Sequence, residues 1–154
     1  AIDIISTIQH EAKSHPNSPF FINLSREIER TYQDFRTRRI ITEEAIDKML
    51  SISQRISDWK KEEQEIGLDK YPIYEAVKFV LPDLEKHEAI DFVNSLLSSL
   101  ESKNFLFKGW QEQREVRRRI RAETMILLLS KFKQRKEKVD ELLNRIFEAL
   151  EVSR

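Results

Sequence analysis

Glycine and proline are scarce in this sequence, which contains 2 glycines and 4 prolines among 154 residues. Average usage would supply about 11 glycines and about 8 prolines in a chain of this length. Sandwiches and barrels depend on many tight turns, and tight turns favour these two residue types. The shortage therefore excludes such folds and leaves few positions for a glycine-rich phosphate-binding loop.

The charged residues balance, with 27 Lys and Arg side chains and 27 Asp and Glu side chains. A neutral chain has no global attraction to nucleic acid or to a membrane surface. The sequence contains no cysteine, which excludes disulfides, thiolate metal sites and thiol nucleophiles. No apolar stretch approaches the roughly 20 residues of a membrane-spanning helix, and no secretion signal opens the chain. We therefore expect a soluble cytoplasmic protein with no membrane partner.

Apolar residues recur at spacings of three and four along most of the chain, which is the pattern of amphipathic helices. The expected helices cover about residues 2–13, 20–38, 42–66, 69–80, 82–103, 110–132 and 138–151. Residues 104–109 are the least helical piece, and the apolar residues 105–107 fit a short strand or an extended segment. Because no second strand pattern exists to pair with them, we expect an all-α protein. Its fold is predicted to be an irregular bundle of six or seven helices in one domain, residues 1–154.

Cap and breaker residues predict several helix ends. Thr42 precedes two glutamates and is expected to cap one helix, which Gly67 is expected to end. Asp69 is expected to cap the next helix, and Pro82-Asp83 to start the one after it. The chain opens at Ala1 in the middle of a helical pattern, so we expect it to be part of a larger chain.

The same spacing predicts which residues face the core. The helix over 20–38 is expected to bury an apolar stripe of Phe21, Leu24, Ile28, Tyr32 and Phe35. Trp59 extends the stripe of the next helix, formed by Ala45, Met49, Ile52 and Ile56. The helix over 110–132 is expected to bury Val116, Ile120 and Leu127. We expect Trp59 and Trp110 to anchor the core rather than to bind a ligand.

A nuclease-like pattern occurs where Pro82-Asp83 is followed by Glu101-Ser102-Lys103. Nucleases of the PD-(D/E)xK type use such an Asp and Glu to hold Mg²⁺ beside a Lys. They need a rigid β-hairpin to bring the three groups together. Here Asp83 and Glu101 lie near opposite ends of one expected helix, roughly 27 Å apart at about 1.5 Å per residue. We therefore expect no nuclease centre in this chain.

Asp83, His87 and Asp91 follow one another at spacings of four, which places them in a row on one helix face. Three ligands in line rarely converge on one ion without help from a second helix. The other histidines, His10 and His15, lie far away in the sequence. We interpret the row as a solvated polar face and expect no metal site, cofactor site or catalytic residue in this chain.

Positive charge is concentrated in residues 108–138, which contain 11 Lys and Arg against 4 Glu, a net charge of +7. Within this stretch the expected helix carries a cluster of arginines on one side at about 100° per residue: Arg114, Arg117, Arg118 and Arg121. Planar guanidinium groups suit phosphate or carboxylate partners. Three interpretations stay open: contact with a partner protein, contact with nucleic acid, or pairing with acidic residues of the same chain, particularly Glu62, Glu63 and Glu65.

Three stretches of the sequence, taken in order, carry a family resemblance. They are Thr42-Glu43-Glu44-Ala45 before a long helix, Gly67-Leu68 with Tyr74-Glu75-Ala76-Val77, and Trp110-x5-Val116-Arg117-x2-Ile120-Arg121-x5-Leu127-Leu128. Over about residues 28–150 the chain resembles the C-terminal helical domain of the R subunit, the motor and restriction subunit, of type I restriction-modification enzymes. It departs from the family pattern at Arg118, where a small residue is usual, and at Ser130-Lys131-Phe132-Lys133, which replaces a glycine- and proline-containing turn.

The resemblance implies that the chain is the C-terminal part of a site-specific deoxyribonuclease that translocates DNA with ATP. Such a subunit carries a nuclease domain and two motor domains, which use Mg²⁺ and ATP, ahead of the helical domain. The helical domain itself is implied to be non-catalytic and to dock the subunit onto the methyltransferase (modification) subunits, beside the motor domains of the same chain.

Two other classes of function compete with this one. The arginine cluster fits a helical nucleic-acid-binding module, and a stand-alone helical adaptor is the third class. Salt separates the first two, because each phosphate contact contributes a slope of roughly 0.9 to the fall of log affinity with log salt. For a docking domain we expect weak DNA affinity, ~10⁻⁴–10⁻⁶ M or weaker at physiological salt.

Overall fold

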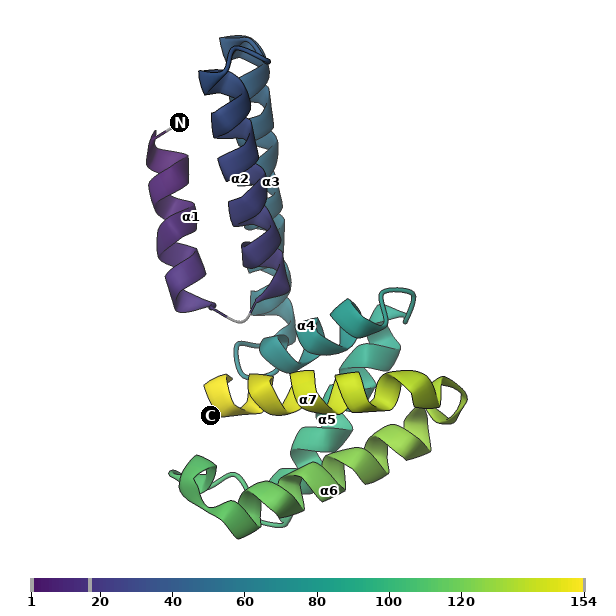
Figure 1. The fold of residues 1–154 in the computed structure, drawn as a ribbon. Helices are drawn as coiled ribbons and strands as arrows, with labels where there is room; N and C mark the ends of the chain where they lie inside the picture. The colour runs from purple at the N-terminus through teal and green to yellow at the C-terminus, as the bar shows by residue number, and fades with distance from the viewer. Residues whose placement is uncertain (1, 17, 154) are drawn as a thin grey trace. The chain divides into compact units, whose positions relative to one another are not determined.

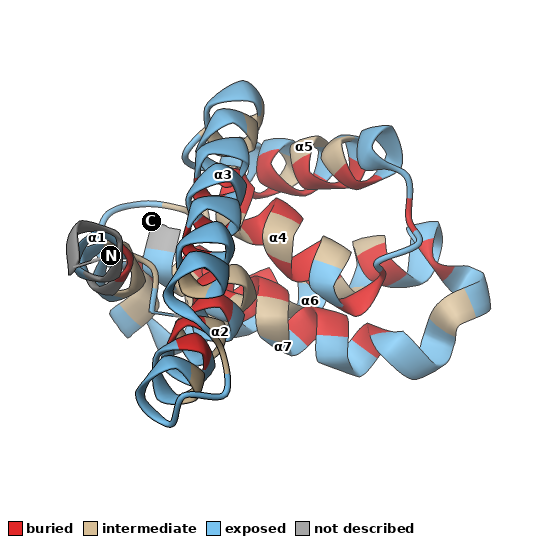
Figure 2. Cartoon of the chain, turned by 90° about the horizontal axis from the view of Figure 1, so that it is seen from above, coloured by how far each residue is buried: buried red, intermediate tan, exposed pale blue. Residues whose placement is uncertain are grey.

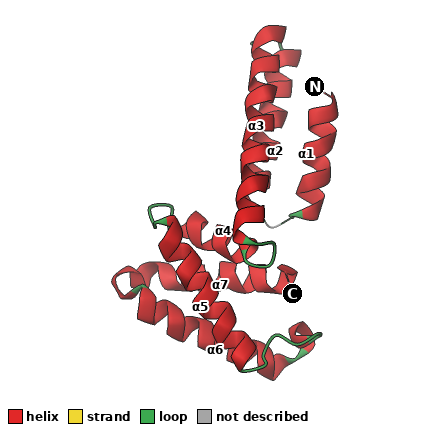
Figure 3. Cartoon of the chain, turned by 180° about the vertical axis from the view of Figure 1, so that it is seen from behind, coloured by secondary structure: helices red, strands yellow, loops and turns green. Residues whose placement is uncertain are grey.

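The structure is a computed structural model that describes residues 2–16 and 18–153, with the side chains of residues 2–5, 9 and 153 left out. Seven α-helices and two short 3₁₀ helices account for the secondary structure of this range, which contains no strand (Figures 1 and 3). The prediction of an all-α fold with six or seven helices is therefore confirmed. The helices pack as two compact units, residues 1–65 and residues 66–154, and the grouping of both into one domain stays a prediction.

The first unit contains α1 (Ile2–Ser14), α2 (Pro19–Arg36) and almost all of α3 (Thr42–Ile66). Pro19 lies in the first turn of α2, where a proline removes no helical hydrogen bond. The Ser18 hydroxyl caps this helix by accepting a hydrogen bond from the Phe21 N–H at 3.5 Å. Gly67, with φ at +115°, follows the last residue of α3. As predicted, this helix ends at a glycine, which adopts a positive φ without strain.

Two predicted helix caps are wrong. Thr42 is the first residue of α3 rather than its cap, because the Ala45 N–H already donates to the Ile41 carbonyl at 3.1 Å. Asp69 lies in a turn, and Lys70 is the N-cap residue of α4 (Tyr71–Val80), with no side-chain hydrogen bond at the cap.

The helix start predicted at Pro82-Asp83 is also wrong, because this pair lies in the turn between α4 and α5 (Lys86–Ser102). The Lys78 ammonium closes the turn by donating hydrogen bonds to the main-chain carbonyls of Pro82, at 3.1 Å, and of Leu84. Because a lysine of α4 satisfies these carbonyls, the chain passes through the turn before α5 begins.

The core of the first unit forms around Trp59, which is 7% exposed. Its ring stacks on Phe20 with a centroid distance of 5.7 Å and lies 4.7 Å from Phe21 in an edge-on contact. The guanidinium of Arg55 on α3 donates two hydrogen bonds to the Glu27 carboxylate on α2, at 3.0 and 2.6 Å. The other buried apolar residues of this unit are Ile8, Leu24, Ile28, Met49, Ile52 and Ile56.

The predicted burial of Tyr32 and Phe35 is wrong, because these side chains are 43% and 42% exposed. The buried residues of α2 end at Thr31, whose hydroxyl donates to the Glu27 carbonyl at 2.9 Å. Within this unit, α1 lies beside α2 but stops short of the ends of α2 and α3 that meet at residues 37–41 (Figure 1).

The second unit contains α4, α5, η1 (Trp110–Glu112), α6 (Arg114–Lys131), η2 (Lys133–Arg135) and α7 (Lys136–Ser153). α7 packs along α4 and α6, and α5 packs against the same two helices. Figure 2 shows the buried residues of these helices as bands along their sides. Trp110 is fully buried and lies 5.9 Å from the Phe147 ring on α7.

The apolar segment 105–107, which was compatible with a short strand, is irregular in the structure. Phe105 and Leu106 are half-buried and Phe107 is 43% exposed. Among the described helices, none combines the length and the apolar character that a membrane crossing requires.

Candidate partner-binding surface on α6

Two of the four predicted surface arginines point toward α7 instead of away from it. The Arg117 Nη2 lies 2.9 Å from Glu151 Oε1, and its Nη1 donates to the Gln111 carbonyl at 3.1 Å. The Arg121 Nη2 donates to Asn144 Oδ1 at 3.1 Å. Both guanidinium groups lie over the ring of Phe147, at 4.9 and 5.2 Å from its centroid. Arg117 and Arg121 therefore join α6 to α7.

Within the second unit, one arginine of the cluster has a carboxylate partner on the neighbouring helix. Glu151 of α7 pairs with Arg117, whereas Glu63 lies 4.0 Å from the His15 Nε2 within the first unit. Partial burial raises the pKa of Glu63, and the neighbouring His15 opposes this shift. Sequence analysis missed Glu151 because α7 carries acidic residues on several of its faces, so spacing alone does not select one.

The other two arginines remain exposed. The side chain of Arg118 is 80% exposed and lies 3.4 Å from Glu115, a carboxylate that also lies 3.4 Å from the Arg119 Nε. An exposed ion pair of this kind contributes little to stability. Arg114 is the first residue of α6 and is exposed, and a cation at a helix N-terminus is opposed by the helix dipole. These arginines are therefore available to a partner.

The line of buried residues on α6 also differs from the predicted one. Ile120 is fully buried as expected, but Val116 and Leu127 are only half-buried. Thr124 and Leu128 are fully buried and complete the line with Ile120. Thr124 tolerates burial because its hydroxyl donates to the Ile120 carbonyl at 2.7 Å.

A carboxylate fixes the side of α6 that faces α5. Glu123 Oε1 accepts a hydrogen bond from the Ser99 hydroxyl at 2.7 Å, and Oε2 accepts one from Lys103 Nζ at 2.7 Å. The hydrogen bond from Lys103, followed by that from Ser99, lowers the pKa of Glu123. With α7 on one side and α5 on the other, only the remaining side of α6 is open.

The open side of α6, which we call the outer face, is defined by six exposed residues: Glu115, Arg118, Arg119, Ala122, Ile126 and Leu129. Its first half is charged and its second half is apolar. Ile126 is 61% exposed and Leu129 is 41% exposed. The spacing of four and three from Ala122 to Ile126 to Leu129 could have identified this line from the sequence.

The residues of the nuclease-like pattern do not meet. The Asp83 carboxylate accepts two hydrogen bonds from Arg135, one of them at 2.9 Å. These bonds lower the pKa of Asp83 from 3.8 to about 2. Glu101 lies in the last turn of α5, and Lys103 bonds to Glu123. Two of the three groups are therefore engaged in ion pairs with other residues.

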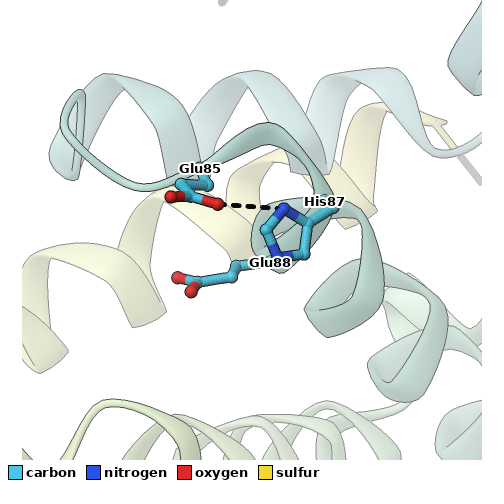
Figure 4. A group of neighbouring side chains, drawn as sticks. All are labelled: Glu85, His87 and Glu88. Atoms are coloured by element: carbon cyan, nitrogen blue, oxygen red, sulfur yellow. Dashed lines mark ion pairs between the residues drawn. The ribbon is translucent and has the colours of Figure 1, made fainter.

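The expected row of Asp83, His87 and Asp91 on one helix is not formed, because Asp83 lies outside α5. Instead, Glu85, His87 and Glu88 gather at the start of that helix, with their ligand atoms within 4.8 Å of one another (Figure 4). The His87 Nδ1 lies 3.2 Å from Glu85 Oε2, and both side chains are about 70% exposed. Imidazole and carboxylate ligands suit zinc, but ordering three exposed side chains on one helix start costs conformational entropy.

Comparison with known proteins gives no match: the chain matches no family model, no curated protein and no solved structure. The expected relationship to type I R subunits therefore rests on the three sequence stretches.

Proposed function

We propose that this chain is a non-catalytic helical assembly domain that docks the R subunit of a type I restriction-modification enzyme onto its methyltransferase core. The observation that carries this proposal is the outer face of α6, where exposed apolar side chains continue from exposed arginines. This face overlaps the third of the sequence stretches that resemble the family. ATP and Mg²⁺ would belong to the motor and nuclease domains of the parent chain.

The composition of the outer face favours a protein partner. Ile126 and Leu129 are exposed on adjacent turns, and removing such apolar surface from water contributes about 25 cal/mol per Å². Arg118 lies about three turns before Leu129 on this face, and arginine is enriched at protein interfaces. An apolar centre beside a guanidinium is typical of a protein contact, because nucleic-acid affinity depends mainly on phosphate contacts.

The engagement of polar groups elsewhere in the second unit also supports a structural role. Asp83 is held by Arg135, and Lys103 is held by Glu123. These are the groups that the nuclease-like pattern would require to be free. Their ion pairs instead connect separate segments of the unit.

Nucleic-acid binding is the second candidate function, and the exposure of Arg114 and Arg118 is the observation that favours it. Two or three phosphate contacts would give only weak binding with a clear dependence on salt. The two candidates therefore differ in both affinity and salt response.

The test is a pair of titrations of the 154-residue chain, one against the methyltransferase core and one against duplex DNA, at about 50 and about 200 mM salt. We expect binding to the core that changes little with salt, and DNA binding no tighter than ~10⁻⁴–10⁻⁶ M. Salt-sensitive DNA binding without binding to the core would contradict the docking proposal and favour the nucleic-acid one.

A further inference from the structure

A histidine lies where the end of α1 meets the other two helices of the first unit. His15 directly follows α1, and its side chain is 29% exposed. The imidazole ring stacks on the Phe21 ring of α2, with a centroid distance of 5.4 Å and an interplanar angle of 10°. It also lies 5.0 Å from the Trp59 ring of α3 in an edge-on contact. His15 therefore contacts α2 and α3 at the point where α1 ends.

Two carboxylates from different helices lie near one nitrogen of this ring. The His15 Nε2 lies 3.7 Å from Glu11 Oε2 on α1 and 4.0 Å from Glu63 Oε2 on α3. The two carboxylate side chains are only 17% and 13% exposed. The other Glu11 oxygen, Oε1, lies 2.5 Å from Lys60 Nζ of α3. These four residues, which we call the His15 cluster, connect α1 to α3.

The charge of the His15 cluster depends on whether the imidazole carries a proton. Ionised Glu11 and Glu63 supply two negative charges, and Lys60 supplies one positive charge. Among the described residues, no other charged side chain pairs with the imidazole, and the contact from α2 is the uncharged Phe21 ring. The cluster is therefore negative when the imidazole is neutral and balanced when His15 is protonated.

Burial makes an unbalanced carboxylate costly at this position. Desolvation raises the pKa of Glu63, and the neighbouring His15 opposes this shift. The Glu11 carboxylate raises the pKa of Glu63 further, and Lys60 lowers it. Because Lys60 already pairs with Glu11 at the shorter distance, the imidazolium is the cation left to balance Glu63. An opposite charge within about 4–6 Å favours the charged form of a group.

We propose that protonation of His15 controls how firmly α1 is attached to α2 and α3. Imidazoles gain and lose their proton between about pH 5 and 8. In the attached state the His15 Nε2 faces two carboxylates, and it loses both contacts when α1 detaches, so attachment favours the protonated form. The stabilisation is therefore present at mildly acidic pH and is lost as the pH rises through this range. This proposal does not depend on the docking function of α6.

The test is hydrogen exchange of the α1 amides in the 154-residue chain at about pH 5.5 and about pH 8. Protection factors remove the intrinsic effect of pH on exchange. We expect protection to fall about threefold at the higher pH, the effect of an ion pair at a partly exposed position. In His15→Gln this fall should be absent, because an amide is uncharged at both pH values. The matched control is His10→Gln, which replaces an exposed histidine of α1 and should keep the fall.

The charge balance of the His15 cluster is tested by Glu63→Gln. This substitution leaves Glu11 and Lys60 as a neutral pair, so the imidazole proton no longer corrects an imbalance. We expect protection of α1 in this variant to be nearly independent of pH, and at about pH 8 to be no lower than in the original chain.

Three results would overturn the proposal: no fall in the original chain, an undiminished fall in His15→Gln, or an undiminished fall in Glu63→Gln. If His15→Gln fails to fold because its two ring contacts are lost, Glu63→Gln decides the proposal, since it leaves both ring contacts in place.

Discussion

Arg117 of α6 and Glu151 of α7 form an ion pair, with Nη2 and Oε1 2.9 Å apart. The Arg117 guanidinium also lies 4.9 Å from the centroid of the Phe147 ring, which makes contact with Arg121 as well. The pair therefore closes the side of α6 that faces α7. What remains for a partner is the outer face.

Reversal of both inward arginines should destabilise the domain. Arg117→Glu with Arg121→Glu places a carboxylate beside Glu151, removes the hydrogen bond from Arg121 to Asn144 and removes two cation–π contacts. We expect a cost of about 1–2 kcal/mol in the free energy of unfolding. Thermal unfolding measures this cost. The control, Arg114→Glu with Arg118→Glu, should stay within about 0.5 kcal/mol of the original chain. A double reversal that leaves stability unchanged would show that Arg117 and Arg121 are free in solution.

Two replacements of Trp110 should separate the effect of its buried volume on stability from the effect of its indole N–H group. Trp110→Ala empties a fully buried site and should cost ~3–5 kcal/mol. The buried Trp110 Nε1 has no hydrogen-bond partner among the described residues, so Trp110→Phe removes an unsatisfied donor and should cost clearly less. Urea unfolding of both variants measures the difference. Equal losses would indicate that the indole N–H is bonded in solution.

The ion pair of Asp83 with Arg135 should appear in the acid titration of the protein. The Arg135 guanidinium lowers the pKa of Asp83 from 3.8 to about 2. Because the folded pKa is depressed, the stabilisation from ionised Asp83 is present above pH 3.8 and is lost as the pH falls through about 2. Carboxyl NMR should give a midpoint near the lower value, and Arg135→Gln should return it toward 3.8. A midpoint of 3.8 in the unmodified protein would rule out the pair.

The helices could be predicted from the sequence because their signals are local. Gly67 ends α3 as expected, since the required positive φ is intrinsic to the residue. Helix starts were predicted less well, because their decisive contacts come from other segments. At Pro82-Asp83, for example, the position of the turn depends on Lys78 of the preceding helix.

The orientation of α6 could not be predicted to the same accuracy. The expected core line was Val116, Ile120 and Leu127, whereas the buried line is Ile120, Thr124 and Leu128. The two lines differ by about 60° at 100° per residue. A pattern of hydrophobic residues does not include Thr124, because threonine is polar. A threonine is acceptable in a core only when its hydroxyl donates a hydrogen bond to a main-chain carbonyl. This rotation brings Arg117 and Arg121 to the boundary with α7.

The exposed ends of α2 and α3 show a second reason why burial could not be fully predicted from the sequence. Tyr32 and Phe35 have the spacing of buried residues, but burial also requires a covering segment. Spacing defines which face of a helix is apolar, and it contains no information on which part of that face another segment covers. The exposure of Tyr32 and Phe35 is therefore a tertiary property.

The most direct test of the docking account measures binding of the methyltransferase core to a variant of the outer face. Ile126→Glu with Leu129→Glu places charge at the apolar half of that face. We predict at least about tenfold weaker binding, equivalent to about 1.4 kcal/mol, with an unchanged melting temperature. The matched control, Ile46→Glu with Leu50→Glu in the first unit, should bind the core as the original chain does. Unchanged binding of the α6 variant, or equal loss in both variants, would contradict the assignment of docking to α6.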